Sequence, residues 1–292
     1  MPGARITETT RGAGGSSLAR AARQSVETDR LLGLTDVWVL SVSSGTPSAD
    51  GRTEAPPAAP ARQAVLAIEA PLGSVAPDAP LHIDRSAWVT PPEGTSPAER
   101  LMALRALHDA NCPHCTTATG HTQTVFGEGN PSARLVFVGE APGETEDQLG
   151  RPFVGRAGQK LDEMIKAMGM SREDVYIANV LKSRPPDNRT PLPTEVERCA
   201  PYLAAQLQII RPEVIVSLGG PATKFLLGVD TGITKLRGQW ADWCPPGAAL
   251  ADRIAVMPTY HPAYLLRNYT PKTRGEVWSD LKQVMERLQQ GS

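Results

Sequence analysis

The pattern of hydrophobic and polar positions changes near residue 95. Beyond that point, short continuous apolar runs alternate with stretches in which apolar residues recur at helical spacing. The apolar runs predict strands at residues 135–138, 175–179, 214–218 and 254–258. The periodic stretches predict helices at about 158–168, 194–210, 222–227 and 272–288, preceded by a helix that begins after the Thr95-Ser96-Pro97 cap and carries Leu101, Leu104 and Leu107.

Alternation of strands and helices predicts an α/β fold. Strands that are apolar throughout are typical of a mostly parallel sheet covered on both faces. We therefore expect a three-layer α/β/α domain over residues 96–292, with a central, mostly parallel, four-stranded sheet. This length is sufficient to bury a core.

The first 95 residues have a different composition. Gly, Ser, Pro and Ala dominate residues 43–97, and repeated prolines interrupt any helix. We interpret residues 1–95 as a largely disordered N-terminal region, because they bury too little apolar surface to offset the entropy of ordering. Residues 17–34 are good helix formers; they form either a short helix that docks elsewhere or a marginal helix in a tail.

Overall charge and cysteine content narrow the function classes. The formal net charge is −1, so any DNA contact has to come from local basic groups. No apolar run approaches the roughly 20 residues of a membrane span, and no secretory signal is evident, so we expect a soluble, cytoplasmic protein. A Cys-x-x-Cys pair, Cys112 and Cys115, points to metal or redox chemistry.

Polar side chains lie at the ends of three predicted strands. Glu140 follows the first strand in a Gly/Pro turn, Asn179 ends the second, and His261 comes after the last. The carboxyl ends of parallel strands meet at one edge of a sheet, so we expect these residues to lie together. An amide such as Asn179 suits the edge of a nucleobase, although each residue could instead have a structural role.

Residues near these positions could contact DNA. Leu265 and Leu266 beside Arg267 suggest an exposed apolar wedge that enters a base stack next to a phosphate contact. Basic residues around the Pro-Pro turn could contact phosphates or simply be solvated: Lys182, Arg184 and Arg189.

Four motifs together closely resemble the family 4 uracil-DNA glycosylases. They are GEAPGETED (139–147), RPFVG (151–155), YIANVLKSRPPDNR (176–189) and YHPAYLLR (260–267). The resemblance covers residues 101–288, and it implies base flipping followed by hydrolysis of the N-glycosidic bond of deoxyuridine. Such a protein is a monofunctional glycosylase of base excision repair, acting on uracil-containing DNA and expected to be a monomer.

The resemblance also implies residue roles. Phe153 would stack on uracil, with core packing as its alternative role. Asn179 would pair with uracil O4 and N3–H, His261 would donate to O2 as the base leaves, and Leu265 and Leu266 would fill the gap in the stack.

Hydrolysis also needs residues that hold and activate the attacking water. Superfamily members with a GQDPYH motif have an aspartate where this chain has Ala141. The nearest carboxylates are Glu140, which we expect to hold the water, and Glu146, which we expect to line the pocket against the methyl group of thymine. Asn188 is a further candidate for positioning the water.

The family resemblance further implies a 4Fe–4S cluster on four cysteines. Cys112, Cys115 and Cys199 match family positions, but Ser183 stands where the third cysteine belongs. The cluster could be completed by the Ser183 oxygen or by Cys244. Two alternatives are a zinc ion, with help from His114 or His121, and an empty site.

Two other functions remain open from the sequence. One is a superfamily relative that excises another deaminated base. The other is a DNA-binding or polymerase-associated accessory protein with weak catalysis, whose N-terminal region recruits a replication or repair partner.

Overall fold

The computed structural model describes residues 88–245 and 252–290. The N-terminal region predicted to be disordered, with the helix predicted at 17–34, lies outside the described residues as far as residue 87. Within the described part, Trp88 and Val89 are half-buried and pack against the hydrophobic core.

A six-stranded sheet forms the centre of the fold, in the order β1-β3-β2-β4-β6-β5. The strands are β1 (Glu128–Gly129), β2 (Leu135–Gly139), β3 (Tyr176–Asn179), β4 (Val214–Leu218), β5 (Ala241–Trp243) and β6 (Ile254–Thr259). The four central strands are parallel, as predicted. The predicted total of four is wrong, because β1 and β5 add short antiparallel edges that lack an apolar run.

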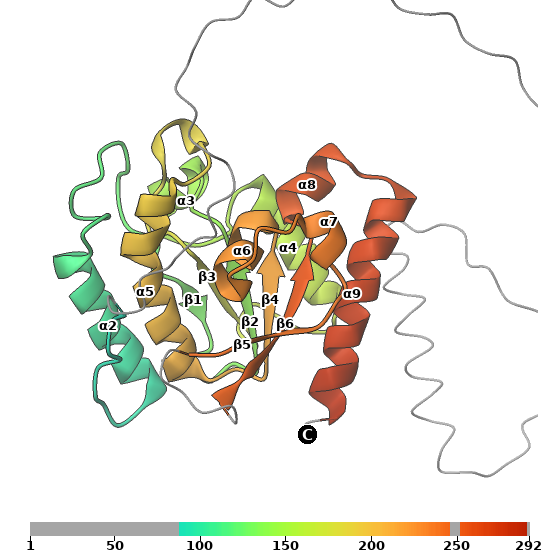
Figure 1. Ribbon diagram of the computed structural model, residues 1–292, viewed down its shortest axis with the longest axis horizontal. Helices are drawn as coiled ribbons and strands as arrows, with labels where there is room; N and C mark the ends of the chain where they lie inside the picture. Colours follow the sequence, from blue (N-terminus) through green and yellow to red (C-terminus); the bar gives the residue numbers. More distant parts are fainter. Residues whose placement is uncertain (1–87, 246–251, 291–292) are drawn as a thin grey trace, which may run out of the picture. The chain divides into compact units, whose positions relative to one another are not determined.

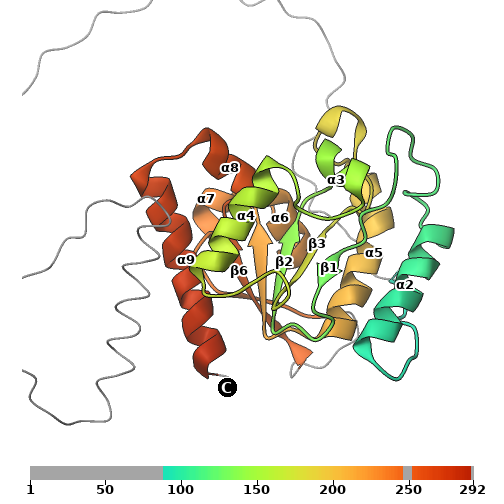
Figure 2. The ribbon, with the colours of Figure 1, turned by 180° about the vertical axis from the view of Figure 1, so that it is seen from behind.

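Helices cover both faces of this sheet, which confirms the three-layer prediction (Figures 1 and 2). One face packs against α2 (Pro97–Asn111), α5 (Pro193–Ile210) and α6 (Gly220–Leu227). The other packs against α4 (Arg156–Ala167), α8 (Pro262–Arg267) and α9 (Pro271–Gln290). The remaining described helices are short: α3 (Glu144–Leu149), a 3-10 turn at Pro186–Asn188, and α7 (Ile233–Leu236).

Strand β2 shows why these strands are apolar throughout. Val136 and Val138 point into the core beneath α2 and α5, whereas Leu135 and Phe137 point into the core beneath α4 and α9. All four side chains have no exposed surface. Because successive strand residues face opposite sides, a sheet covered twice needs apolar residues at every position.

The start of α2 matches its predicted cap. Ser96 Oγ accepts a hydrogen bond from Glu99 N at 3.3 Å, and the Glu99 carboxylate accepts one from Ser96 N at 3.2 Å. Pro97 occupies the first turn, where its missing N–H costs nothing. Such a cap contributes about 1 kcal/mol to the stability of the helix.

The order of the strands in the sheet indicates where a ligand would bind. The chain runs from β2 to β3 on one side and then to β4 on the other, so the direction of winding reverses at β2. Open α/β sheets bind ligands beyond the carboxyl ends of strands at such a reversal. No helix in the described part of the chain is long and apolar enough to cross a membrane.

Candidate active site and metal-ligand cluster

A cavity of about 670 Å³ opens at the carboxyl edge of the sheet. Its walls come from the loops that follow β2, β3, β4 and β6. Eight of the predicted site residues line it: Glu140, Ala141, Glu146, Phe153, Asn179, Asn188, His261 and Arg267. The sheet therefore brings together side chains that are far apart in the sequence, as the strand ends predicted.

Asn179 ends β3 and has 1% of its surface exposed. Its side-chain Oδ1 is buried and has no hydrogen-bond partner in the described part of the chain. Its backbone carbonyl accepts a hydrogen bond from Lys182 Nζ at 2.8 Å. A buried carbonyl oxygen without a donor costs about 1–3 kcal/mol, so this atom favours a ligand that brings an N–H group.

Gly139 allows two side chains that line the cavity to approach the end of β2. A Cβ atom at this position would collide with Asn179 Oδ1 and with Phe153 Cζ. Any residue with a Cβ atom at this position would therefore force Asn179 and Phe153 to shift.

Phe153 adopts a left-handed backbone conformation, with φ of 52°. Its loop is held from outside by Arg172, which donates hydrogen bonds to Phe153 O at 3.0 Å and to Pro152 O at 2.7 Å. A non-glycine residue in this region is strained, and such strain persists where the surroundings fix it. The structure thus fixes an aromatic ring in the cavity wall.

Glu146 holds the same loop from inside the cavity. Its Oε1 accepts hydrogen bonds from Val154 N at 2.9 Å and from Gly155 N at 2.8 Å. Gly155 is the N-cap of α4, so the carboxylate also lies at the positive end of a helix. The sequence did not reveal this contribution, which fixes the position of Phe153.

His261 caps α8 with its side chain. Nδ1 accepts a hydrogen bond from Ala263 N at 3.1 Å, so the proton of the neutral ring is on Nε2. Burial, with help from Arg267, lowers the pKa of His261 to about 4. The ring lies 5.6 Å from that of Phe153, centroid to centroid. The cavity therefore contains a neutral imidazole that can donate from Nε2.

The two residues predicted to hold or position the water, Glu140 and Asn188, differ in whether their side-chain oxygens already accept a hydrogen bond. Glu140 lines the cavity, and its carboxylate has no hydrogen-bond partner among the described residues. Burial raises the pKa of Glu140. Asn188 is exposed, and its Oδ1 accepts a hydrogen bond from Arg184 Nε at 2.8 Å. Glu140 is thus the freer acceptor of the two.

The predicted wedge of two exposed leucines is wrong. Residues 262–267 form helix α8, and neighbouring residues of a helix point about 100° apart. Leu265 is 3% exposed and packs in the core beneath α4 and α9, whereas Leu266 is 37% exposed. Arg267 is exposed and lines the cavity.

Lys182 is not available for a phosphate, contrary to the sequence expectation. It has no exposed surface, and its ammonium group donates to Gln206 Oε1 at 2.6 Å as well as to Asn179 O. Burial lowers the pKa of Lys182 to about 8. Arg189 is exposed but forms an ion pair with Glu195, with N–O distances of 2.7 and 2.8 Å.

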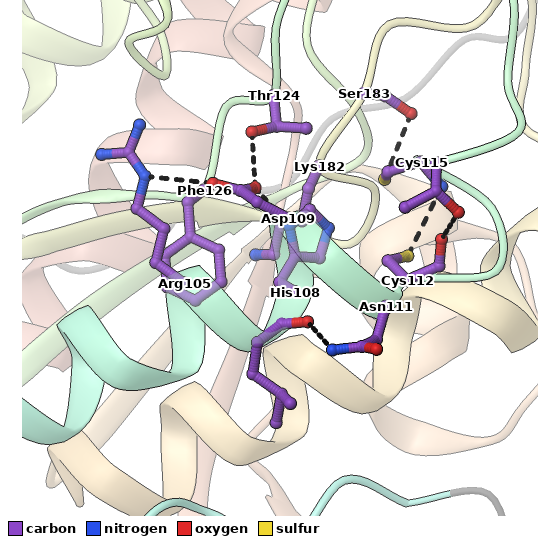
Figure 3. Close-up of polar contacts among 12 residues, drawn as sticks. Arg105, His108, Asp109, Asn111, Cys112, Cys115, Thr124, Phe126, Lys182 and Ser183 are labelled. Carbon is purple, nitrogen blue, oxygen red and sulfur yellow. Dashed lines mark hydrogen bonds and ion pairs between the residues drawn. The ribbon is translucent and has the colours of Figure 1, made fainter.

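A second group of side chains lies beside the segment that follows β3 (Figure 3). Cys112, Cys115 and Cys199 come together as predicted, and all three are buried. Cys115 Sγ lies 3.6 Å from Cys199 Sγ and 3.4 Å from Ser183 Oγ. Lys182 N donates to Cys199 Sγ at 3.2 Å. The four family positions are therefore neighbours in space.

The sequence did not reveal His108. Its ring nitrogen belongs to the same group as the three thiols, and the four ligand atoms lie within 4.8 Å of one another. His108 follows Leu104 by one helical turn and precedes Cys112 by four residues, and this spacing from Cys112 is the signal that could have identified it. Among the described residues, Cys244, His114 and His121 lie outside this group.

Comparison with known proteins agrees with this geometry. Residues 126–282 match the model of the uracil DNA glycosylase superfamily. The chain is 47% identical over 187 residues to the type-4 uracil-DNA glycosylase of Thermotoga maritima, which covers 64% of this chain and 94% of the relative. It is 45% identical over 183 residues to the type-4 uracil-DNA glycosylase of Archaeoglobus fulgidus, covering 60% and 87%.

A type-5 uracil-DNA glycosylase of Pyrobaculum aerophilum is 32% identical over 170 residues, covering 51% of this chain and 71% of the relative. The type-4 proteins thus match more of the chain at higher identity. The chain belongs to the uracil-DNA glycosylase superfamily and, within it, to the type-4 uracil-DNA glycosylases.

Proposed function

We propose that this protein removes uracil from DNA by hydrolysing the N-glycosidic bond, the first step of base excision repair. The observation that carries the proposal is the buried, unpaired Oδ1 of Asn179 in a cavity that also holds an aromatic ring and a neutral imidazole donor. The names of the type-4 relatives support the same activity.

Asn179 would identify the base. Uracil presents an N–H donor at N3 and an acceptor at O4, and these match the Oδ1 acceptor and the Nδ2 donors of one amide. Cytosine presents the reverse pattern at the same two positions, so it would leave the buried oxygen unpaired. A site built to hydrogen-bond a substrate discriminates strongly against a base that cannot do so.

His261 would stabilise the leaving base. As the bond between C1′ and N1 breaks, its electron pair remains on uracil and negative charge builds at O2. The Nε2–H of a neutral, fixed imidazole is a preorganised donor for that oxygen, and removing one such donor typically costs about 3–4 kcal/mol of transition-state stabilisation. Phe153 would stack on the base in the same cavity.

Glu140 would hold the attacking water. The water oxygen forms the new bond to C1′ and its proton passes to the Glu140 carboxylate, which has no competing hydrogen bond among the described residues. Glu146 acts here as a positioning residue through the Phe153 loop. None of the described cavity residues is a lysine, which favours simple hydrolysis over a covalent intermediate.

The base has to leave the duplex to enter this cavity, at a cost of a few kcal/mol, least for a mismatched base. Leu266 would occupy the gap in the stack, and Arg267 would contact a neighbouring phosphate. Both side chains are exposed on α8 beside the cavity.

The cysteine group would hold a 4Fe–4S cluster. Three thiolates in a buried pocket are soft ligands that suit such a cluster, and His108 Nε2 or Ser183 Oγ offers a fourth donor. When bound, the cluster would act as a structural link that ties α2 and α5 to the segment after β3. A tetrahedral zinc ion is the alternative.

An excision assay tests the proposal. The full-length protein is incubated with end-labelled oligonucleotides that contain uracil, thymine, cytosine or another deaminated base at one position. We expect strand breaks only for uracil and only after alkali, because hydrolysis leaves an intact abasic strand. Intact uracil strands after alkali would refute the activity, and tight DNA binding without excision would favour an accessory protein instead.

A further inference from the structure

We propose that His108 is the fourth protein ligand of the metal centre, in place of the cysteine that Ser183 replaces. The inference rests on the proposal that this site holds a metal, and it assigns a ligand that the family motif does not contain. The centre would then be held by three thiolates and one imidazole.

The position of His108 satisfies the first requirement for a ligand. It lies one helical turn before Cys112, and its ring nitrogen is within 4.8 Å of all three sulfur atoms. The side chain has no exposed surface, and Nε2 has no hydrogen-bond partner in the described part of the chain. A buried nitrogen without a partner costs stability unless it binds something, and three sulfur atoms are its neighbours.

The other ring nitrogen is arranged as in known metal sites. His108 Nδ1 lies 2.9 Å from Asp109 Oδ1, so Nδ1–H donates to the carboxylate and the lone pair remains on Nε2. Asp109 is itself held, because Oδ1 accepts from Thr124 Oγ1 at 2.8 Å and Oδ2 lies 3.7 Å from Arg105 Nε (Figure 3). Ligating histidines almost always donate their second N–H to a carboxylate, a backbone carbonyl or a water.

Aromatic neighbours fix the plane of the ring. Tyr202 lies edge-on to His108, with the ring centroids 4.8 Å apart and the planes at 88°. Phe126 packs at a centroid distance of 5.6 Å. These contacts leave the imidazole little freedom to turn away from the sulfur atoms.

Ser183 has a different role in this arrangement. Its hydroxyl is 3.4 Å from Cys115 Sγ, and once that sulfur is a thiolate the O–H can donate to it. An imidazole nitrogen suits iron or zinc better than an undissociated hydroxyl does. Replacing a thiolate by a neutral imidazole makes the centre less negative, so an iron–sulfur cluster here should have a raised reduction potential.

Nitrogen ligation can be measured directly in the whole protein. Full-length protein is purified without oxygen, with and without ¹⁵N-labelled histidine, and its iron, sulfide and zinc contents are determined. For a reduced iron–sulfur cluster, we expect a nitrogen coupling in pulsed EPR that changes with the label. For zinc, X-ray absorption should show one nitrogen at about 2.0–2.1 Å beside three sulfurs at about 2.3 Å.

Variants separate ligation from packing. We expect His108→Ala to lose most of its metal, and the added substitution Ser183→Cys to restore it through the family position while the nitrogen coupling stays absent. Asp109→Asn should weaken metal retention about 10–100-fold, as loss of the carboxylate that holds a ligating histidine usually does. His114→Ala is the matched control, because His114 is also buried with an unpaired Nε2 but lies outside the ligand group.

The outcomes distinguish the proposal that His108 is a ligand from the proposal that the site holds a metal. A wild-type centre without nitrogen coupling, or full metal retention in His108→Ala, would overturn the role of His108 and leave the metal proposal standing. Wild-type protein with neither iron nor zinc would overturn both, whereas uracil excision is scored separately on the same samples. If His108→Ala does not fold, the spectrum of the wild-type protein decides alone.

Discussion

In the proposed function, base recognition depends on Asn179 Oδ1, a buried atom without a hydrogen-bond partner among the described residues. We expect Asn179→Asp to reduce uracil excision at least about 100-fold, because it keeps the size of the side chain while replacing amide donors with carboxylate oxygens. Single-turnover assays on a uracil oligonucleotide measure the change, and thermal unfolding checks that the variant is folded. Excision at the wild-type rate would show that Asn179 does not read the base.

His261 should remain neutral well below the ordinary pKa of histidine. Its pKa of about 4 lies below the usual 6.5, so between these values the unfolded chain binds a proton that the folded protein does not. This histidine therefore lowers the stability of the fold as the pH falls through that window. We expect ¹⁵N NMR to show protonated Nε2 at neutral pH and a titration midpoint well below 6; a midpoint near 6.5 would contradict the buried environment.

Helix α8 separates two neighbouring leucines into different roles. We expect Leu266→Ala to weaken excision from duplex DNA more than from single strands, because the exposed side chain replaces the flipped base. Leu265→Ala should instead lower the free energy of unfolding by about 2–5 kcal/mol, as core truncations do. Denaturant unfolding and paired activity assays separate the effects, and a large stability loss in Leu266→Ala would contradict this division.

The end of β2 leaves no space for a side chain at Gly139. We expect Gly139→Ala to abolish uracil excision, because its Cβ collides with both Asn179 and Phe153. Gly275→Ala in α9 is the matched control, since its Cβ meets nothing within 4 Å, and it should stabilise the helix by up to about 1 kcal/mol. Excision rates and melting temperatures of both variants provide the comparison; an active Gly139→Ala protein would mean that the two side chains can shift.

The elements that the sequence predicted correctly are those whose signal is local. The four central strands could be recognised because each is an apolar run between turns, and α2 because Ser96 and Glu99 mark its start. The edge strands β1 and β5 could not be recognised, because each is a short, partly exposed segment. Its strand conformation depends on pairing with a neighbouring strand. The site residues differ in the same way, because only some of them have a local signal in the sequence.

Asn179 and His261 were predicted because each ends a strand or follows one. His108 was not predicted, because its place on the buried side of α2 is equally compatible with core packing, and Cys199 joins the group only in the folded chain. The burial of Leu265 likewise depends on how α8 packs against the core, and the sequence of the two leucines does not determine that packing.

For the whole molecule, we expect the catalytic domain to fold without residues 1–87. A protein beginning at residue 88 should match the full chain in melting temperature and single-turnover excision, because every proposed site residue lies in the later part. A protein beginning at residue 96 should be less stable, because it lacks Trp88 and Val89 from the core and Thr95, which bonds Glu99. Equal stability of the two truncated proteins would contradict the packing of Trp88 and Val89.

Lys182 connects the two functional regions, because its backbone N–H bonds Cys199 while its ammonium group bonds the carbonyl of Asn179. If the cysteine group holds the proposed metal centre, damage to that centre would disturb Asn179, the residue proposed to select the base. Deaminated cytosine that escapes excision is copied as thymine. A cell that relies on this enzyme would then acquire C-to-T mutations whenever the centre is damaged, even though the gene for the enzyme is unchanged.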